Sequence, residues 1–271
     1  MLQIKSAWNH GHESMNDTAS PSSATARPAR TALILGASGT IGGRVARELI
    51  MRGYHVGLHY HTRVDACREI ETLAASSGVT ARSYAADFNS AEAPGALATA
   101  FLKDFGRIDA LVCCAGIVRD APLLTLKDAD LRAVVNVNLR SVFLVLKSLS
   151  RQFMKQKSGA VVALSSHAGV SGRAGGCAYA MAHSGLQALV RSAAREWGAF
   201  NIRVNAVLPP FVPESGMGRA ASPEFAAAVK ARRVLKADSD GAAAVAVFMA
   251  GLLDNPAVSG QILSADSRIH V

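Results

Sequence analysis

The sequence predicts a single α/β domain in which helices cover both faces of a doubly wound, seven-stranded parallel sheet. Two observations support this prediction. Short apolar runs alternate with longer segments of helical periodicity from Thr31 onward, and a glycine-rich turn joins the first apolar run to the first helical segment. Hydrophobic residues make up 50% of the 271 residues. A domain of this class reaches roughly 250 residues around one sheet, so the length does not require a second domain.

The predicted elements follow one another from the first strand to the last. The strands cover 31–35, 55–60, 81–85, 108–113, 160–164, 202–207 and 261–264, and the helices lie near 41–52, 65–76, 91–105, 128–157, 178–200, 222–235 and 240–252. This alternation indicates repeated strand–helix–strand units with right-handed crossovers. Residues 1–29 mix small and polar types without a period, which is typical of a flexible tail. The folded domain is therefore expected at 30–271.

The net charge of +9 comes from 29 Lys and Arg against 20 Asp and Glu. These cations are spread along the chain, and aromatic residues make up only 6%, so we do not expect nucleic-acid binding. The four cysteines show no CxxC spacing, and no apolar run approaches the ~20 residues of a membrane span. We expect a cytoplasmic protein with no membrane partner. His55, His59 and His61 share one strand face, but this pattern alone does not predict a metal site.

The glycine-rich turn places Gly36, Gly39 and Gly42 at intervals of three. Gly36 permits a tight turn, Gly39 lets the backbone approach a pyrophosphate, and Gly42 allows close packing of helix on strand. Strand, glycines and helix occur in the order of a Rossmann fold, so we expect a dinucleotide here; the alternative is a purely structural turn. The residues expected to bind it are Gly36, Ser38, Gly39, Thr40, Ile41 and Gly42.

The second strand ends in His59-Tyr60-His61-Thr62-Arg63, without the Asp or Glu that an NAD site offers to the ribose about 20 residues after the first glycine. A cation at this point suits the 2′-phosphate of NADP. His61 and Arg63 are therefore expected to bind NADP(H). The alternative is that Arg63 is only a solvated charge at the start of a helix.

Further motifs follow in order along the chain: Asp87-Phe88, Cys113-Cys114-Ala115-Gly116, Val137-Asn138-Leu139, Ser165-Ser166 and Tyr179-Ala180-Met181-Ala182-His183. Each motif is weak alone. Together with the glycine-rich turn, from Thr31 to about Asp266, they resemble the short-chain dehydrogenase/reductase family, and particularly its 3-oxoacyl-[acyl-carrier-protein] reductases.

The resemblance implies a role for each motif. The cofactor site would include Asp87, bonded to the adenine amino group, with Phe88, Ala115, Gly116 and Pro209; the catalytic set would be Asn138, Ser166, Tyr179 and His183, the last two also touching the cofactor. Tyr179 would donate a proton to the developing alkoxide, while Ser166 would hold the oxygen. Asn138 would anchor a water of the proton relay. Without the resemblance, the three residues could be a core Tyr, a turn Ser and a helix Asn.

His183 stands where the family has a Lys, four residues after the Tyr. That Lys would hold the nicotinamide ribose and lower the pKa of the phenol. A His with an unperturbed pKa near ~6.5 is protonated only about a quarter of the time at pH 7. We therefore expect weak activation of Tyr179 that improves at mildly acid pH, unless His167 also reaches the site.

Other departures from the family gather at the nicotinamide end. They are Cys113-Cys114 for Asn-Asn, Pro209-Pro210 for Pro-Gly, Glu214 for a Thr that contacts the carboxamide, and Asp266-Ser267-Arg268 for Asp-Gly-Gly. Four such changes predict altered chemistry or reduced activity.

The function expected from the resemblance is NADP(H)-dependent reduction of a ketone, as a 3-oxoacyl or polyketide-type thioester on a carrier protein, in fatty acid or polyketide biosynthesis. Arg151 would be a docking cation for the acidic carrier. One alternative is a non-reductive family member, such as a cyclase, dehydratase or epimerase. The other is a catalytically silent nucleotide-binding subunit that pairs with an active homologue.

Two segments bear on partners and substrate entry. The helices near 128–157 and 178–200 carry apolar residues on more than one face, which predicts a dimer or tetramer, or a hetero-oligomer with a homologue; the alternative is a well-buried monomer. A substrate lid is expected between Pro209 and Lys236, with an apolar entrance at Phe211, Met217 and Phe225.

Overall fold

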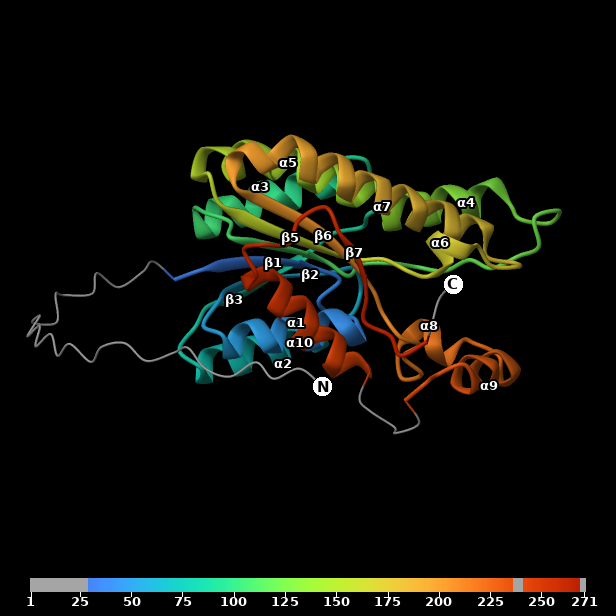
Figure 1. The fold of residues 1–271 in the computed structure, drawn as a ribbon. Helices are drawn as coiled ribbons and strands as arrows, with labels where there is room; N and C mark the ends of the chain where they lie inside the picture. Colours follow the sequence, from blue (N-terminus) through green and yellow to red (C-terminus); the bar gives the residue numbers. More distant parts are fainter. Residues whose placement is uncertain (1–28, 236–240, 269–271) are drawn as a thin grey trace, which may run out of the picture.

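The computed structural model describes residues 29–235 and 241–268 and contains one sheet of seven parallel strands (Figure 1). The strands are β1 (Thr31–Leu35), β2 (His55–Tyr60), β3 (Ala81–Ala85), β4 (Ala110–Cys113), β5 (Gly159–Leu164), β6 (Ile202–Leu208) and β7 (Ile262–Ser264). Their order in the sheet is β3-β2-β1-β4-β5-β6-β7. The chain winds outward from β1 to β3 and then returns to β4 on the other side of β1. This order confirms the predicted doubly wound fold.

Helices cover both faces of the sheet (Figure 1). One face carries α1 (Thr40–Met51), α2 (Val64–Ser76) and α10 (Gly241–Asp254); the other carries α3 (Ala93–Phe105), α4 (Asp128–Val135), α5 (Ser141–Gln156) and α7 (Cys177–Trp197). Shorter helices complete the described part of the chain: α6 (Ala168–Ser171), α8 (Gly216–Arg219), α9 (Pro223–Ala231), the π-helix η1 (Asn136–Arg140) and the 3₁₀-helix η2 (Gly198–Phe200).

The core lies in two layers because the central strands are apolar on both sides. Every residue of β1 is buried, with Ala32 and Ile34 in the cluster beneath α1 and α10, and Leu33 and Leu35 in the cluster beneath α3, α5 and α7. A strand covered on both faces must be a continuous apolar run, which explains why the run Thr31–Leu35 was readily recognised in the sequence.

Several predicted elements differ in their bounds from the structure, and two of these differences are informative. The helix expected over 128–157 contains the π-helix η1, so one continuous helical stretch holds three segments. β4 begins at Ala110 rather than at 108, because the Gln156 side chain bonds the backbone of Ile108: its Oε1 accepts from the Ile108 N–H at 3.1 Å, and its Nε2 donates to the Ile108 carbonyl at 2.6 Å. A side chain thus takes the bonds that a neighbouring strand would have made.

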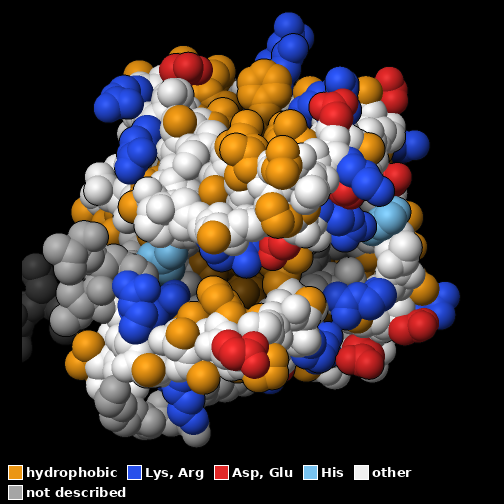
Figure 2. All heavy atoms as spheres, turned by 90° about the vertical axis from the view of Figure 1, so that its right-hand side faces the viewer, with side chains coloured by type: hydrophobic (Ala, Val, Ile, Leu, Met, Phe, Trp, Pro, Cys, Tyr) orange, Lys and Arg blue, Asp and Glu red, His pale blue; other side chains and the backbone are white. Residues whose placement is uncertain are grey.

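The carboxyl ends of the strands meet at one edge of the sheet, where α8 and α9 extend beyond it (Figure 1). Figure 2 views this edge face-on and shows a hollow near its centre, with hydrophobic side chains inside and Lys and Arg side chains on the rim. Ligands of doubly wound sheets bind at this edge, close to the point where the strand order reverses. The search for a site therefore begins between β1 and β4.

Candidate functional site

The glycine-rich turn leaves no room for side chains on its inner side. Gly36 has φ +78°, and a Cβ there would lie 2.6 Å from the backbone nitrogen of Ala115. A Cβ on Gly42 would lie 2.2 Å from the Gly36 carbonyl oxygen. Gly39 is the N-cap residue of α1 and provides no side-chain cap, and the first turn of α1 carries no acidic residue. The turn therefore offers backbone N–H groups and the positive end of a helix dipole, the arrangement that binds phosphate.

His59 holds this turn from behind, a role that the sequence did not predict. Its Nδ1 accepts from the Gly36 N–H at 3.0 Å, so its Nε2 carries the proton and donates to the Ala86 carbonyl at 3.1 Å. The ring stacks on Phe88 at 4.1 Å, and burial lowers the pKa of His59 to about 4. A neutral imidazole thus connects the ends of three strand–loop units. Only the placement of the strands side by side could have shown this.

The end of β2 presents the residues predicted for the adenosine part of a cofactor. His61 and Arg63 are both exposed, and the His61 Nε2 lies 3.9 Å from the Asp87 Oδ1. The backbone N–H of Asn89 donates to Asp87 at 2.9 Å, which lowers the pKa of this carboxyl. The ring of Phe88 is 4% exposed. Because that ring is buried on His59, only the backbone of Phe88 is free to meet a ligand.

Ala115 and Gly116 follow β4 directly across from the glycine-rich turn. A Cβ on Gly116 would lie 3.4 Å from Met217 Cε, so a side chain of α8 covers this position. Pro209 is partly exposed just after β6. Ser215 caps α8, its Oγ accepting from the Gly218 N–H at 2.9 Å. α8, within the predicted lid, therefore lies over the site, whereas Lys236 at the end of that predicted lid lies outside the described residues.

Asn138 lies in the π-helix and is buried. Its Oδ1 accepts from the Ile117 N–H, and its Nδ2 donates to the Ile117 carbonyl, both at 2.9 Å. π-Bulges are frequent at functional sites. The paired bonds fix the loop after β4 against the helix, and they support a positioning role for the Asn138 side chain. The water relay predicted for this residue stays a prediction.

Ser166 and Tyr179 come together, although they belong to different elements. Ser166 lies just after β5 and Tyr179 in the first turn of α7, and their side chains hydrogen-bond one another. The Ser166 Oγ also accepts from the Ala168 N–H at 3.1 Å. Burial raises the pKa of the Tyr179 hydroxyl above that of an ordinary phenol, although the Ser166 bond acts to lower it. The pair offers a protonated phenol beside a hydroxyl.

His183 lies one turn after Tyr179, with the two ring centroids 4.2 Å apart. The imidazole is 5% exposed, and neither nitrogen has a hydrogen-bond partner in the described structure. Burial lowers its pKa to about 4. The structure thus contradicts the expectation that His183 is protonated a quarter of the time at pH 7 and more at mildly acid pH. Desolvation without a compensating carboxylate is the physical reason.

His167 does not take the place of a missing cation beside Tyr179. Its Nε2 lies 3.5 Å from the Asp266 Oδ2 and 3.4 Å from the Ser264 Oγ. Burial would raise the pKa of Asp266, but the hydrogen bonds from Arg268 outweigh it and lower this pKa. The residue after Ser166 is therefore tied to the segment that follows β7.

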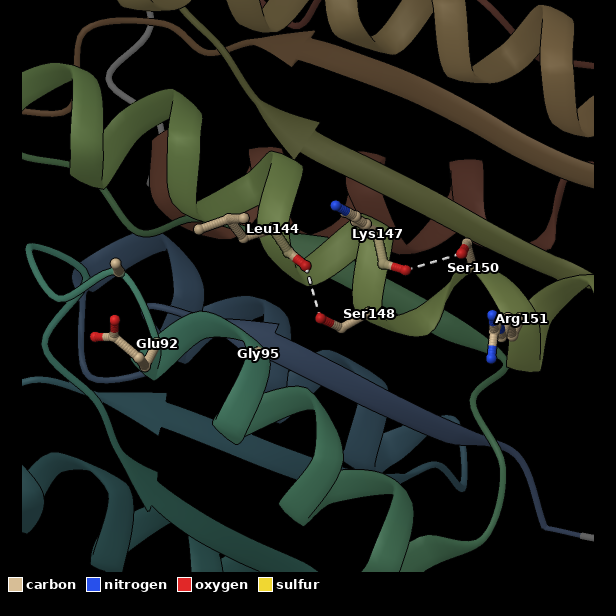
Figure 3. Close-up of a pocket in the computed structure, with 8 residues that line it drawn as sticks. Glu92, Gly95, Leu144, Lys147, Ser148, Ser150 and Arg151 are labelled. Carbon is tan, nitrogen blue, oxygen red and sulfur yellow. Dashed lines mark hydrogen bonds between the residues drawn. The ribbon is translucent and has the colours of Figure 1, made fainter.

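A second cavity lies away from the glycine-rich turn, between α3 and α5 (Figure 3). It has a volume of about 580 Å³ and is lined by Ala91, Glu92, Gly95, Leu144, Lys147, Ser148, Ser150 and Arg151. Lys147 and Arg151 are exposed, one turn apart on α5. The sequence assigned a docking role to Arg151, and the structure places it beside a second cation and this cavity.

Most apolar residues behind the oligomer prediction fill the core of the single chain. Val134, Leu146, Leu186 and Trp197 are buried within it, whereas Phe143 is 47% exposed. The apolar character of these helices therefore has an explanation within one protomer.

One helical stretch, Asp128–Gln156, has the length and composition of a membrane span, and 44% of its most apolar window is buried. Core helices of soluble proteins meet the same criteria, so this is weak evidence for a membrane. The described residues contain no group of three or more His, Cys, Asp or Glu side chains that could hold a metal ion.

The reversal of strand order and the uncapped glycine-rich turn at that reversal define a Rossmann-like nucleotide-binding domain. A family model described as short chain dehydrogenase matches residues 30–226. The chain belongs to this short-chain dehydrogenase family, whose members are oxidoreductases that use a nicotinamide cofactor.

Known proteins support this assignment. Nodulation protein G of Rhizobium sp. is 37% identical over 188 residues, which cover 69% of this chain and 75% of that protein. A 3-oxoacyl-[acyl-carrier-protein] reductase of Staphylococcus aureus is 34% identical over 183 residues, covering 68% and 74%. The crystal structure of NAD⁺-bound xylitol dehydrogenase superposes with a TM-score of 0.81 at 29% identity, covering 88% of this chain and 98% of that one.

Proposed function

We propose that the chain is an NADP(H)-dependent ketoreductase and that Ser166 and Tyr179 act on the carbonyl oxygen. The observation that carries the proposal is the hydrogen-bonded Ser166–Tyr179 pair beside a buried, unpartnered His183. Both features lie at the carboxyl edge of the sheet, where the glycine-rich turn also lies.

The residues present fit a dinucleotide. Gly36, Gly39 and Gly42 form a cradle that a Cβ would fill, which suits the pyrophosphate. Among the described residues, the two ring nitrogens of His183 are buried without hydrogen-bond partners, a costly state that a ribose hydroxyl would relieve. Asp87 would hold the adenine amino group. Ala115, Gly116 and Pro209 would line the rest of the cofactor site, as the resemblance implies.

The 2′-phosphate of NADP would lie against His61 and Arg63. Arg63 forms no hydrogen bond or ion pair with other described residues, so its guanidinium is available to a phosphate. No Asp or Glu stands at the end of β2 to take a ribose diol instead. These two observations favour NADP over NAD.

When bound, the reduced nicotinamide would supply the hydride that reaches the carbonyl carbon. The Ser166 hydroxyl would donate a hydrogen bond to the carbonyl oxygen, and the Tyr179 hydroxyl would give that oxygen its proton. Because burial raises the pKa of Tyr179, this phenol stays protonated at neutral pH. A protonated Tyr179 can donate a proton and therefore favours ketone reduction, whereas alcohol oxidation would need the phenolate.

The substrate class that we propose is a 3-oxoacyl or polyketide-type thioester on a carrier protein. The Staphylococcus aureus relative is named a 3-oxoacyl-[acyl-carrier-protein] reductase, and the exposed Lys147 and Arg151 would contact an acidic carrier. We also propose a cytoplasmic dimer or tetramer, for which the exposed Phe143 on α5 and Val247 and Phe248 on α10 supply apolar surface.

Two measurements test this function. Titration of the full chain with NADPH, followed by cofactor fluorescence, is expected to show binding. Mixing with acetoacetyl-CoA is then expected to oxidise NADPH slowly, because His183, which stands in the position of the family Lys, is neutral. Binding without turnover on any ketone would instead favour the silent partner subunit. Product formation without NADPH consumption would favour a cyclase, dehydratase or epimerase.

A further inference from the structure

A pair of charged residues lies near the start of α7, the helix that carries Tyr179. The Arg173 Nη2 lies 2.6 Å from both carboxylate oxygens of Asp120. Arg173 belongs to the loop that enters α7, and Asp120 to the loop between β4 and α4. The Ala121 N–H donates to the Gly175 carbonyl at 2.8 Å, so the backbones of the two loops are also joined. The ion pair therefore has a fixed position rather than lying on two independent loops.

The Arg173 guanidinium lies close to the start of the helix that carries Tyr179. A Cβ on Gly176, the residue before α7, would lie 2.8 Å from the Arg173 Nε. From the other side, the ring of Phe225 on α9 lies 6.0 Å from the guanidinium. Arg173 is thus held between the first turn of α7 and the segment that covers the site, and its side chain is 33% exposed.

The charges of this pair act on the Tyr179 hydroxyl in opposite directions. After burial and the Ser166 hydrogen bond, Arg173 is the next influence on its pKa and lowers it, while Asp120 raises it. His183 is close but neutral. The apolar cluster on which Tyr179 packs consists of Val134, Ala178 and Ala182. Arg173 is thus a cation near the start of α7 whose charge favours the Tyr179 phenolate, and the charge of Asp120 opposes it.

We propose that the Arg173–Asp120 ion pair is a positioning pair that controls how readily the Tyr179 hydroxyl gives up its proton. The proposal rests on the proposed function, in which that proton moves to the carbonyl oxygen. The O–H bond of Tyr179 breaks as the new O–H bond of the alcohol forms, and the electron pair stays on the phenolate oxygen. The carbonyl carbon is reduced by the hydride, and the dihydronicotinamide is oxidised. A guanidinium stabilises the phenolate, and a carboxylate opposes it.

The two charge-removing variants have opposite expected effects. Asp120→Asn leaves the Arg173 charge uncompensated, so Tyr179 becomes more acidic. Alcohol oxidation at pH 8 is then expected to rise about three- to tenfold, because the partly exposed pair is screened by solvent. Arg173→Gln leaves the Asp120 charge alone, and the same rate is expected to fall by a similar factor. The double variant is expected to lie near the wild type, and Arg173→Lys to retain most of the effect of the cation.

A matched control uses an ion pair on the opposite face of the sheet. Arg47 on α1 and Glu69 on α2 lie 3.3 Å apart. Arg47→Gln and Glu69→Gln change the net charge as Arg173→Gln and Asp120→Asn do. Neither is expected to move the pH profile.

The decisive readout does not require turnover. Tyrosine labelled with ¹³C at Cζ reports phenol ionisation by NMR, and Tyr179→Phe assigns the signal. Opposite displacements of the Tyr179 titration in the two single variants would support the proposal. Displacements in the same direction, or none, would overturn it. An ion pair that only joined two loops would not shift the Tyr179 titration in opposite directions when one or the other charge is removed. A chain that reduces no ketone but shows opposite displacements would refute the proposed function and leave this inference standing.

Discussion

His183 lies with its ring centroid 4.2 Å from that of Tyr179, and in the described structure neither of its nitrogens has a hydrogen-bond partner. An imidazole in this state is neutral, because burial lowers its pKa to about 4. The residue can therefore donate or accept a hydrogen bond, but it cannot supply the positive charge that a Lys would bring. This relationship governs the first two predictions.

Replacing His183 with Lys tests the missing charge. An ammonium beside Tyr179 would stabilise the phenolate and favour both proton release and ribose binding. We expect His183→Lys to raise ketone reduction about tenfold, measured as NADPH oxidation at pH 7. His183→Gln, which adds no charge, is the control. A His183→Lys variant that folds but turns over no faster would indicate a repurposed site rather than an impaired one.

The affinity for cofactor should be insensitive to mildly acid pH. Because His183 stays neutral well below pH 6, its contact with a ribose hydroxyl does not change between pH 5.5 and 7. The dissociation constant of NADH, which lacks the 2′-phosphate, is expected to vary less than about threefold over this range by fluorescence titration. A steep tightening toward pH 5.5 that disappears in His183→Gln would contradict a neutral imidazole.

Tyr179→Phe should separate chemistry from binding. Loss of a general acid typically costs about 10² to 10⁴ in rate, and we expect a loss of that size in ketone reduction. The dissociation constant of NADPH should change less than about threefold, since only one hydroxyl is removed. Unchanged turnover would refute the role assigned to Tyr179.

The choice of cofactor should depend on Arg63. A charge-assisted hydrogen bond contributes about 1.5–3 kcal/mol, so Arg63→Ala is expected to weaken NADPH binding roughly tenfold or more and to leave NADH binding unchanged. Arg68 is exposed one turn further along α2, and Arg68→Ala serves as the control. Equal weakening for both cofactors would show that Arg63 does not read the 2′-phosphate.

Acid should destabilise the fold without cofactor through His59 and His183. Both pKa values are lowered to about 4 by burial, against 6.5 for an ordinary His. The unfolded chain therefore binds more protons between pH 6.5 and 4, so stability falls as the pH decreases through this window. Each histidine contributes about 3 kcal/mol at neutral pH that is lost near pH 4.

Urea unfolding followed by circular dichroism at pH 7 and pH 5 measures this loss. His59→Asn is expected to lower stability at pH 7, because the bonds to Gly36 and Ala86 are weakened, and to reduce the difference between the two pH values. The control is His55→Gln at the start of the same strand. An undiminished difference in His59→Asn would contradict the assignment.

The sequence was sufficient for the fold because the signal is local. Apolar runs such as Thr31–Leu35 and the glycines at 36, 39 and 42 each predict their own conformation from neighbouring residues. The resemblance to the short-chain dehydrogenase/reductase family likewise implied that Ser166 and Tyr179 act together, and the structure brings them within hydrogen-bond contact.

Features that depend on distant partners were not accessible from the sequence. The Asn138 side chain bonds the backbone of Ile117, and the tautomer of His59 is determined by its bonds to Gly36 and Ala86. The charge state of His183 follows from the burial of its side chain, which the spacing of residues in the sequence does not indicate. The pairing of Arg173 with Asp120 joins residues 53 positions apart, and no periodic pattern connects them.

The close approach of Gly36 to Ala115 has a consequence for how the protein folds. Ala115 lies behind the glycine-rich turn only when β4 has docked against β1. This contact joins segments far apart in the chain. Closing such a long loop is a slow step. A partly folded chain that contains only β1, β2 and β3 would have the turn but no wall behind it. During refolding, nucleotide affinity should therefore appear after helix formation. The time between these two events would measure how long the second half of the sheet takes to dock.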